Sequence, residues 1–177
     1  PIGPYYTRED AEKLARERGW MFTEIKGRGY RRVVPSPRPI DIVDLCAVES
    51  AVEGCDVVVA GGGGGVPVVS VGGRLVGVDA VVDKDLTSSL LARKLGASKL
   101  VILTDVGGVY LHYGTPRARM LRTVTTAELR RYMEKGHFPP GTMGPKVEAA
   151  IEFVESTGRA ASIGHLFRLE DVVRGSE

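Results

Sequence analysis

The spacing of apolar residues changes several times along the chain, and each change predicts a different element. Residues 7–19 have helical spacing, with Thr7 and Asp10 as a capping pair and Gly19 as a stop signal, which predicts a short surface helix. Residues 21–25 and 30–34 instead alternate on either side of a Gly-Arg-Gly turn, which predicts a β-hairpin. The opening Pro-Ile-Gly-Pro reads as a loop.

After residue 40 the pattern alternates between helical spacing and short apolar runs. The predicted helices span about 40–53, 86–95, 126–135, 146–157 and 169–173. The predicted strands span about 55–59, 68–71, 74–76, 99–105 and 160–163. The run at 99–105 is unbroken, which is typical of a strand covered on both faces.

This order of elements predicts an α/β fold, with a mostly parallel sheet sandwiched by helices and ligands at the carboxyl ends of the strands. We expect one domain over residues 1–177. Residues 1–39 would form a connecting segment with a hairpin, and residues 40–177 would form the core. A length of 177 residues and a hydrophobic content of 43% suit a single buried core of this kind.

The charge balance gives no reason to expect a nucleic-acid or membrane partner. Lysine and arginine total 24 against 22 acidic residues, a net charge of +2. One basic cluster, Arg28, Arg31, Arg32 and Arg38, is interpreted as a solvated or ion-paired strand and loop rather than a nucleic-acid patch. No apolar stretch approaches the length of a membrane-spanning helix.

The cysteine and amide contents indicate the cellular compartment and the growth temperature to which the protein is adapted. Cys46 and Cys55 lack metal-ligand spacing, which favours a reducing, cytoplasmic compartment and predicts no metal site. The chain contains neither Asn nor Gln. Because these amides are thermolabile, their absence indicates a heat-adapted source.

Five consecutive glycines, residues 61–65, follow the predicted strand at 55–59. Without Cβ atoms, the backbone N–H groups of such a loop can approach a phosphate closely. A flexible linker is the alternative, but linkers are polar and Ser-rich. This run lies between valines on both sides, so we favour a phosphate cradle.

Two lysines stand at predicted helix starts. Lys84, between Asp83 and Asp85, can meet a phosphate while a carboxylate orients the lysine or a magnesium ion, although a capped surface turn is equally consistent with this segment alone. Lys146 follows a glycine-rich loop and Pro145, which suits a first helical turn. Since the helix dipole disfavours a cation there, Lys146 indicates an anionic ligand.

The segment from Thr104 to Tyr110 ends the apolar strand at 99–105. In a doubly wound sheet a nucleotide base and ribose lie at this end of a strand, and a plain strand-to-turn connection is the alternative. This segment indicates a nucleotide site only in combination with the glycine run and the two lysines.

Together these segments resemble the carbamate kinases, within the amino acid kinase family. The resemblance rests on the strings GRGYRRVVPSPRP, GGGGVPV, VVDKDLTSSLLA, LVILTDVGGVY and GHFPPGTMGPKVEAAIEFV. The VDKDL and GHFPPGTMGPKVEAA blocks indicate the subfamily, whereas the TDVxGVY string is shared with related kinases. Family members usually carry an acid at the position of Gly107.

The resemblance implies phosphoryl transfer between ATP and carbamate, giving carbamoyl phosphate and ADP, with Mg²⁺, in arginine metabolism. It implies that Lys84 and Lys146 neutralise charge on the moving phosphoryl group and that Asp85 holds both lysines. The phosphates would contact Gly62, Gly63, Gly64 and Gly65. The remaining nucleotide-binding residues implied are Leu86, Thr104, Asp105, Val109, Tyr110, Met143 and Gly144.

The resemblance also implies that the N-terminal part of the fold is missing from this sequence, so that the chain corresponds to the C-terminal, nucleotide-binding half. We therefore expect a homodimer or an association with the missing N-terminal half. Two other functions remain open at this point. One is an amino acid kinase with a different acyl acceptor, and the other is a truncated nucleotide-binding partner without turnover.

Overall fold

The computed structural model describes residues 1–175, and they form two compact units. Unit 1 consists of Pro1–Pro37 and Val66–Val82, and unit 2 consists of Arg38–Gly65 together with the residues from Asp83 onward. The 66–82 segment therefore groups with the N-terminal residues, whereas the sequence placed it in the core. Whether the chain acts as a single domain stays a prediction, and its last two residues lie outside the described part.

Unit 1 is built from one helix and short antiparallel strands. Its elements are β1 (Ile2–Tyr6), α1 (Arg8–Arg18), β2 (Met21–Ile25), β3 (Gly29–Val33), β4 (Val68–Val71) and β5 (Arg74–Gly77). The predicted helix is confirmed, because Thr7 accepts the Asp10 N–H at its start and Gly19 adopts a left-handed conformation at its end. The predicted hairpin β2–β3 is also confirmed, and the two strands predicted at 68–71 and 74–76 pair with each other as β4–β5.

The expectation of a loop at the N-terminus was wrong. Residues Ile2–Tyr6 form β1, which pairs with β3 at the edge of a sheet ordered β1-β3-β2. Proline lacks an N–H donor, but an edge strand tolerates it because one side of the strand needs no partner. Pro4 therefore does not prevent pairing at this position.

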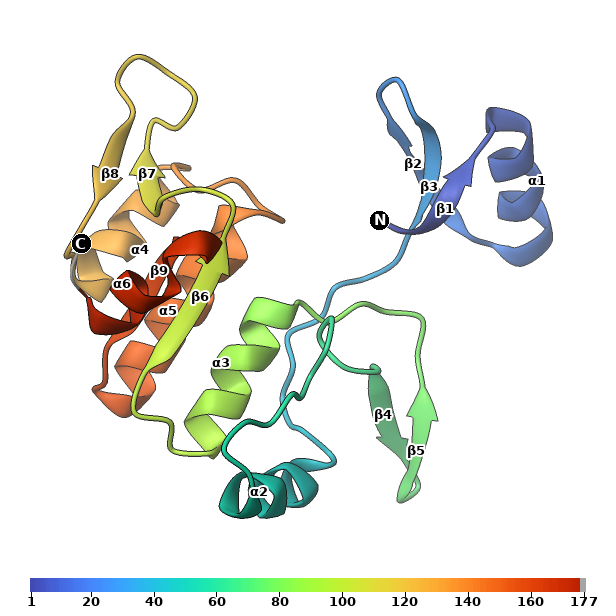
Figure 1. The fold of residues 1–177 in the computed structure, drawn as a ribbon. Coiled ribbons are helices and arrows are strands. Elements are labelled where there is room, and N and C mark those ends of the chain that lie inside the picture. Colours follow the sequence, from blue (N-terminus) through green and yellow to red (C-terminus); the bar gives the residue numbers. More distant parts are fainter. Residues whose placement is uncertain (176–177) are drawn as a thin grey trace. The chain divides into compact units, whose positions relative to one another are not determined.

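Unit 2 contains the helical layers and a parallel strand pair (Figure 1). Its elements are α2 (Leu45–Gly54), α3 (Lys84–Lys94), β6 (Leu100–Thr104), β7 (Val109–Leu111), β8 (Arg119–Leu121), α4 (Thr126–Glu134), α5 (Met143–Thr157), β9 (Ala161–His165), a 3₁₀ turn η1 (Leu166–Arg168) and α6 (Leu169–Arg174). The antiparallel pair β7–β8 was not predicted, because each strand has only three residues. Helix α2 begins five residues later than expected, at Leu45.

Strands β6 and β9 run parallel, in the register Leu100↔Ala161 through Thr104↔His165. Helices cover both faces of this pair. Ile163 packs into the core clusters that α5 supports, whereas a Cβ on the next residue, Gly164, would clash with Val172 of α6. Because neighbouring residues of a strand face opposite sides, α5 and α6 lie on opposite faces. The predicted helix–sheet–helix layering is thus present around β6 and β9.

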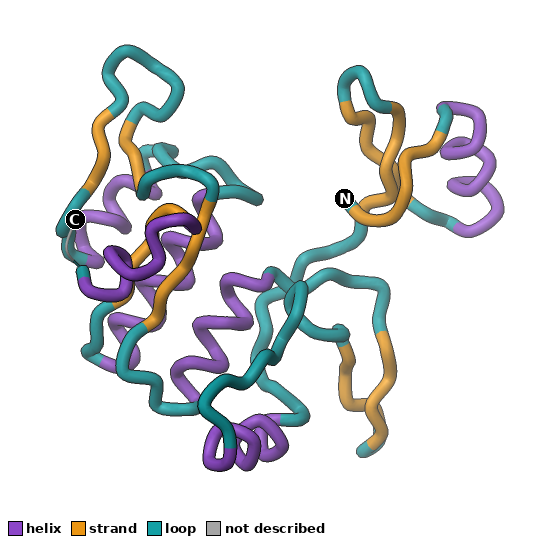
Figure 2. Tube along the Cα trace, in the orientation of Figure 1, coloured by secondary structure: helices purple, strands orange, loops and turns teal. Residues whose placement is uncertain are grey.

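The predicted buried strand at residues 55–59 does not form. The chain between α2 and β4 is a long loop (Figure 2), and Val57 and Val59 are 80% and 94% exposed. A strand is stabilised by a ladder with a neighbour, and no strand among residues 1–175 pairs with this segment. As a result, parallel pairing within the described residues is limited to β6 and β9, and the other ladders are antiparallel.

The apolar core of unit 2 has two clusters on either side of α5. One cluster contains Val109, Leu111, Leu129, Phe138, Val147 and Ile151. The other contains Leu86, Leu100, Ile102, Ala149 and Phe153. Helix α5 contributes to both, which makes it the central support of the unit. Ser89 of α3 adds a buried polar tie, since its hydroxyl donates to the Ala149 carbonyl at 2.8 Å.

Candidate active site

Helix α3 begins with a capped turn that exposes one lysine and buries one carboxylate. The Asp83 side chain accepts the backbone N–H groups of Asp85 and Leu86, at 2.8 and 3.3 Å. Asp83 therefore occupies N–H groups that an anion would otherwise contact. Lys84 projects into solvent with 59% of its side chain exposed, whereas the Asp85 side chain is only 9% exposed.

The buried Asp85 carboxylate meets Lys146, which lies 61 residues later in the chain. Lys146 Nζ donates to both carboxylate oxygens of Asp85, at 2.9 and 3.2 Å, and its own side chain is 12% exposed. Lys84 Nζ lies 3.9 Å from Asp85 Oδ2. The fold thus brings the three predicted catalytic residues together, with two cations on one carboxylate. This cluster keeps a net positive charge, which suits an anionic ligand.

Helix α5 has an uncapped start beside this cluster. Thr142 precedes it and makes no side-chain cap bond, and the first turn contains no acidic residue. Gly144 N–H donates to the Pro139 carbonyl at 3.0 Å, and a Cβ on Gly144 would come within 3.0 Å of that oxygen. A side chain at position 144 would therefore crowd the close turn that leads to Lys146. The positive end of the α5 dipole adds to the charge of that lysine.

The glycine run forms a tight turn rather than an extended linker. Gly64 N–H donates to the Gly61 carbonyl at 2.9 Å, and Thr87 Oγ1 of α3 donates to the Gly64 carbonyl at 3.0 Å. Gly64 is buried, whereas Gly61, Gly62, Gly63 and Gly65 are exposed. Four exposed glycines next to the start of α3 present backbone groups to solvent, as a phosphate cradle requires.

The other predicted nucleotide-binding residues lie in two different settings. Thr104 ends β6, half-buried, and donates to the side chain of the exposed Asp105 at 3.2 Å. Tyr110 is half-buried, and its ring lies 5.6 Å from that of Tyr113. A Cβ at Gly107 would lie 3.2 Å from the Tyr110 hydroxyl, so a larger residue there would displace this ring.

Leu86, Val109 and Met143 instead contact the hydrophobic core. Leu86 and Val109 are each 8% exposed and belong to the two core clusters, and Met143 packs against the cluster that contains Val109. Their side chains therefore support the walls of the region rather than project freely into it. Their predicted contact with a nucleotide stays a prediction.

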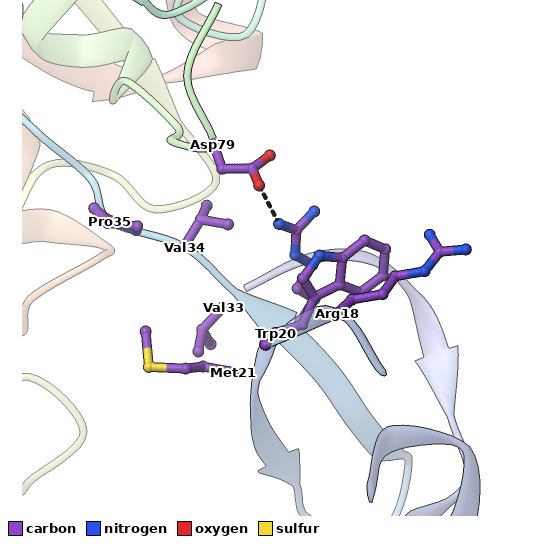
Figure 3. A pocket seen from close by; sticks show the side chains of 9 residues that line it. Arg18, Trp20, Met21, Val33, Val34, Pro35 and Asp79 are labelled. Carbon is purple, nitrogen blue, oxygen red and sulfur yellow. Dashed lines mark hydrogen bonds and ion pairs between the residues drawn. The ribbon is translucent and has the colours of Figure 1, made fainter. Parts of the chain in front are cut away.

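A pocket in unit 1 is lined by residues that were not predicted to bind ligand (Figure 3). Arg32 donates to Asp79 at 2.6 Å, and its guanidinium carbon lies 3.9 Å from the centroid of the Trp20 ring. Arg38 of unit 2 pairs with Glu148 and Glu152. These contacts confirm ion pairing for two members of the basic cluster.

Two further features are absent from residues 1–175. No group of three or more His, Cys, Asp or Glu residues has the geometry to hold a metal ion within this range. In the same range, no helix has both the length and the apolar character needed to cross a membrane.

Comparison with known proteins places this geometry in a family. The model of the amino acid kinase family matches residues 9–165. The chain belongs to the amino acid kinase family. The match includes the glycine run, the Asp85 cluster and the start of α5, so the elements described above are parts of an amino acid kinase fold of the α/β class.

Individual relatives agree with this placement. The carbamate kinase of Pyrococcus furiosus is 49% identical over 175 residues, which cover 99% of this chain and 56% of the relative. A crystal structure from Aeropyrum pernix K1 is 56% identical with a TM-score of 0.93, covering 99% of this chain and 56% of that one. The carbamate kinase of Giardia lamblia bound to AMP-PNP is 40% identical with a TM-score of 0.89, with the same coverage. This chain thus spans just over half the length of the relatives that it matches.

Sequence reasoning did not identify Thr87 as part of the site. Thr87 lies inside the VDKDLTSS string, but nothing in a single sequence distinguishes a buried threonine that bonds a distant loop from one that caps or packs locally. Only the contact with Gly64 reveals its position.

Proposed function

We propose that this chain is the ATP-binding part of a carbamate kinase, the C-terminal half of such an enzyme. The reaction is phosphoryl transfer between ATP and carbamate, which interconverts carbamoyl phosphate and ADP with carbamate and ATP. The observation that carries the proposal is the buried Asp85–Lys146 pair, with Lys84 beside it, at the starts of α3 and α5. The carbamate kinase relatives support the choice of acceptor.

Phosphoryl transfer depends mainly on positioning and on charge stabilisation, and the cluster supplies both. In this proposal Lys84 and Lys146 neutralise the charge that spreads over the transferred phosphoryl oxygens. Asp85 accepts both Lys146 hydrogen bonds and restrains that lysine in a buried position. A side chain that is already ordered loses little entropy when the transition state forms.

The nucleotide would occupy the space between the glycine run and the end of β6. Gly62, Gly63 and Gly65 would contact the phosphates through the backbone. Gly64, predicted to join them, is buried, its N–H donates to the Gly61 carbonyl and its carbonyl accepts from Thr87, so it would support the turn instead. The base and ribose would lie against Leu86, Thr104, Asp105, Val109, Tyr110, Met143 and Gly144. The Giardia relative that carries AMP-PNP supports a nucleotide ligand.

The described residues fit Mg²⁺ only as an ion that arrives with the nucleotide. Mg²⁺ in kinases is held by one or two carboxylates together with substrate phosphates. Asp85 already accepts two hydrogen bonds from Lys146, and residues 1–175 contain no metal-binding cluster of three. When bound, the ion would offset charge on the phosphate oxygens, and Lys84 and Lys146 would supply the protein's share of that effect.

The acceptor site would need residues from outside this chain. The exposed valines Val57 and Val59 are apolar surface that soluble proteins normally cover. We propose that they are covered by the part of the enzyme that this chain does not match in its relatives, or in a homodimer. Pairing of residues 55–59 with a strand of that part would satisfy the backbone groups that are now unpaired.

The test measures ATP formation from carbamoyl phosphate and Mg-ADP, together with calorimetric titration of Mg-ADP. The chain is assayed alone and after co-expression with the part of the Pyrococcus furiosus relative that it does not match. We expect nucleotide binding by the chain and turnover by the combination. Binding without turnover in both preparations would leave a nucleotide-binding protein and refute the kinase proposal.

Substitutions then test the residues. Lys84→Ala and Lys146→Ala should each lower the turnover rate on the order of 10²–10³-fold, because each removes one preorganised charge. Lys135→Ala, which removes an exposed lysine at the end of α4, is the matched control and should leave turnover unchanged. Near-normal kinetics in a Lys84 or Lys146 variant would remove that residue from the mechanism.

A further inference from the structure

We propose that Thr87 is a positioning residue that holds the glycine run 61–65 in its phosphate-binding shape. The inference rests on the proposed function, since it assumes that this run contacts nucleotide phosphates. It goes further by naming the side chain that orders the loop and the part of the ligand whose binding depends on it.

The Thr87 hydroxyl contacts the loop, and its methyl group lies close to it. The hydroxyl donates to the Gly64 carbonyl at 3.0 Å, in a buried environment. The Cγ2 methyl lies 3.8 Å from the place where a Cβ on Gly61 would stand. Thr87 is 8% exposed and Gly64 is buried, so water does not replace this hydrogen bond easily.

This hydrogen bond is a long-range contact and not a feature of the helix itself. A threonine within a helix commonly donates to the carbonyl four residues earlier. In α3 that carbonyl, on Asp83, accepts the backbone N–H of Thr87 at 3.0 Å. The hydroxyl bonds Gly64 instead, 23 residues away in the sequence. The side chain therefore acts between the helix and the loop.

The loop has few other restraints. Gly61, Gly62, Gly64 and Gly65 all have positive φ, and the space around the Cβ positions of Gly62, Gly63 and Gly65 is open. Glycine has more backbone freedom to lose than any other residue, so a run of five is costly to order. Within residues 1–175, the Thr87 hydroxyl supplies the hydrogen bond that joins this run to α3.

The position of Thr87 links the loop to the charged cluster. Thr87 follows Lys84 by three residues, so both lie on the first turns of α3. The same stretch carries Asp85, which binds Lys146. Thus one short segment of helix fixes the loop, the exposed lysine and the buried ion pair relative to one another. A phosphate cradle requires this kind of fixed relation between backbone donors and lysines.

The test compares Thr87→Val, Thr87→Ser and Thr87→Ala in the chain as it stands. Valine keeps the shape of threonine but loses the hydroxyl, and serine keeps the hydroxyl. Serine and alanine differ only by the oxygen, so that pair still isolates the hydrogen bond if the valine variant does not fold. The measurements are amide hydrogen exchange of Gly64, whose N–H donates to the Gly61 carbonyl, by NMR without nucleotide, and the affinities for Mg-ADP and adenosine.

We expect the valine and alanine variants to exchange the Gly64 amide several-fold faster than the wild type. They should bind Mg-ADP about fivefold more weakly, as loss of one hydrogen bond worth roughly 1 kcal/mol predicts, with less than a twofold change for adenosine. The serine variant should behave as the wild type in all three measurements. A lower affinity for ADP with an unchanged affinity for adenosine is expected only if the loop contacts phosphate.

Two results would overturn the inference. One is unchanged exchange and unchanged ADP affinity in variants without the hydroxyl. The other is an equal loss of ADP and adenosine affinity, which would mean that Thr87 only supports the fold. If the wild type binds neither ligand, the proposed function fails, and the exchange data still decide whether Thr87 orders the loop.

Discussion

The pairing of Asp85 with Lys146 predicts a large and specific loss of stability when one partner is removed. In the variant Lys146→Met the Asp85 carboxylate remains 9% exposed and loses the group that donates to both of its oxygens. Breaking a buried pair in this way costs about 3–5 kcal/mol, because an uncompensated charge stays in the interior. Lys84 offsets little of this loss, since its amine is 3.9 Å away and its side chain is 59% exposed.

A double-mutant cycle separates this charge effect from lost packing. Asp85→Asn alone leaves the Lys146 ammonium, 12% exposed, without a carboxylate. The double variant Asp85→Asn/Lys146→Met buries no charge and should recover most of the stability. We expect the sum of the losses in unfolding free energy of the two single variants to exceed the loss in the double variant by at least about 2 kcal/mol.

The assay is urea unfolding followed by far-UV circular dichroism, with the free energy of unfolding extrapolated to water. Arg130→Met is the control, since it breaks an ion pair with Glu155 in which both side chains are more than one third exposed. This variant should unfold almost as the wild type does. Additive losses in the Asp85–Lys146 cycle would refute the reasoning, because they would show that the two charges do not stabilise each other.

Two other predictions concern the packing of α6 and the start of α4. Gly164→Ala should destabilise the chain by about 1–3 kcal/mol, because the added Cβ would clash with Val172. The control is Gly54→Ala, whose Cβ meets open space and should not destabilise the chain. Equal urea midpoints for the two variants would contradict this prediction. Hydrogen bonds from the backbone N–H and hydroxyl of Thr125 lower the pKa of Glu128 in the folded chain. The ionised carboxylate therefore stabilises the fold at pH values above the usual glutamate pKa of roughly 4.3. This stabilisation is lost as the pH falls through the lower pKa of the folded chain. The stability difference between wild type and Glu128→Ala should therefore shrink between pH 7 and pH 3, and urea titrations that show a constant difference would contradict it.

Much of the fold follows from local signals in the sequence. The start and end of α1 are predicted by Thr7 and Gly19, and the turn of the β2–β3 hairpin by the glycines at 27 and 29. The limits of α3, α4, α5 and β6 agree with the expected ones to within about three residues. Such signals are reliable because caps, turns and side-chain periodicity act within a few residues of each other.

The strand predicted at residues 55–59 illustrates where local signals fail. An apolar run shows that a segment can be buried, but a strand needs a partner for its backbone hydrogen bonds. Val57 and Val59 do not determine which segment would be that partner. In the described residues the partner is lacking, so the run forms an exposed loop.

As with the fold, some properties of the site follow from the sequence and others only from the tertiary structure. The sequence by itself determined which chemistry is available, namely a glycine run and two lysines at helix starts, since these depend on residue types and local spacing. Only the tertiary structure decided that Lys146 meets Asp85 and that Thr87 meets Gly64. These contacts depend on how α3 and α5 pack, and that packing is set by many distributed apolar contacts rather than by the residues that finally meet.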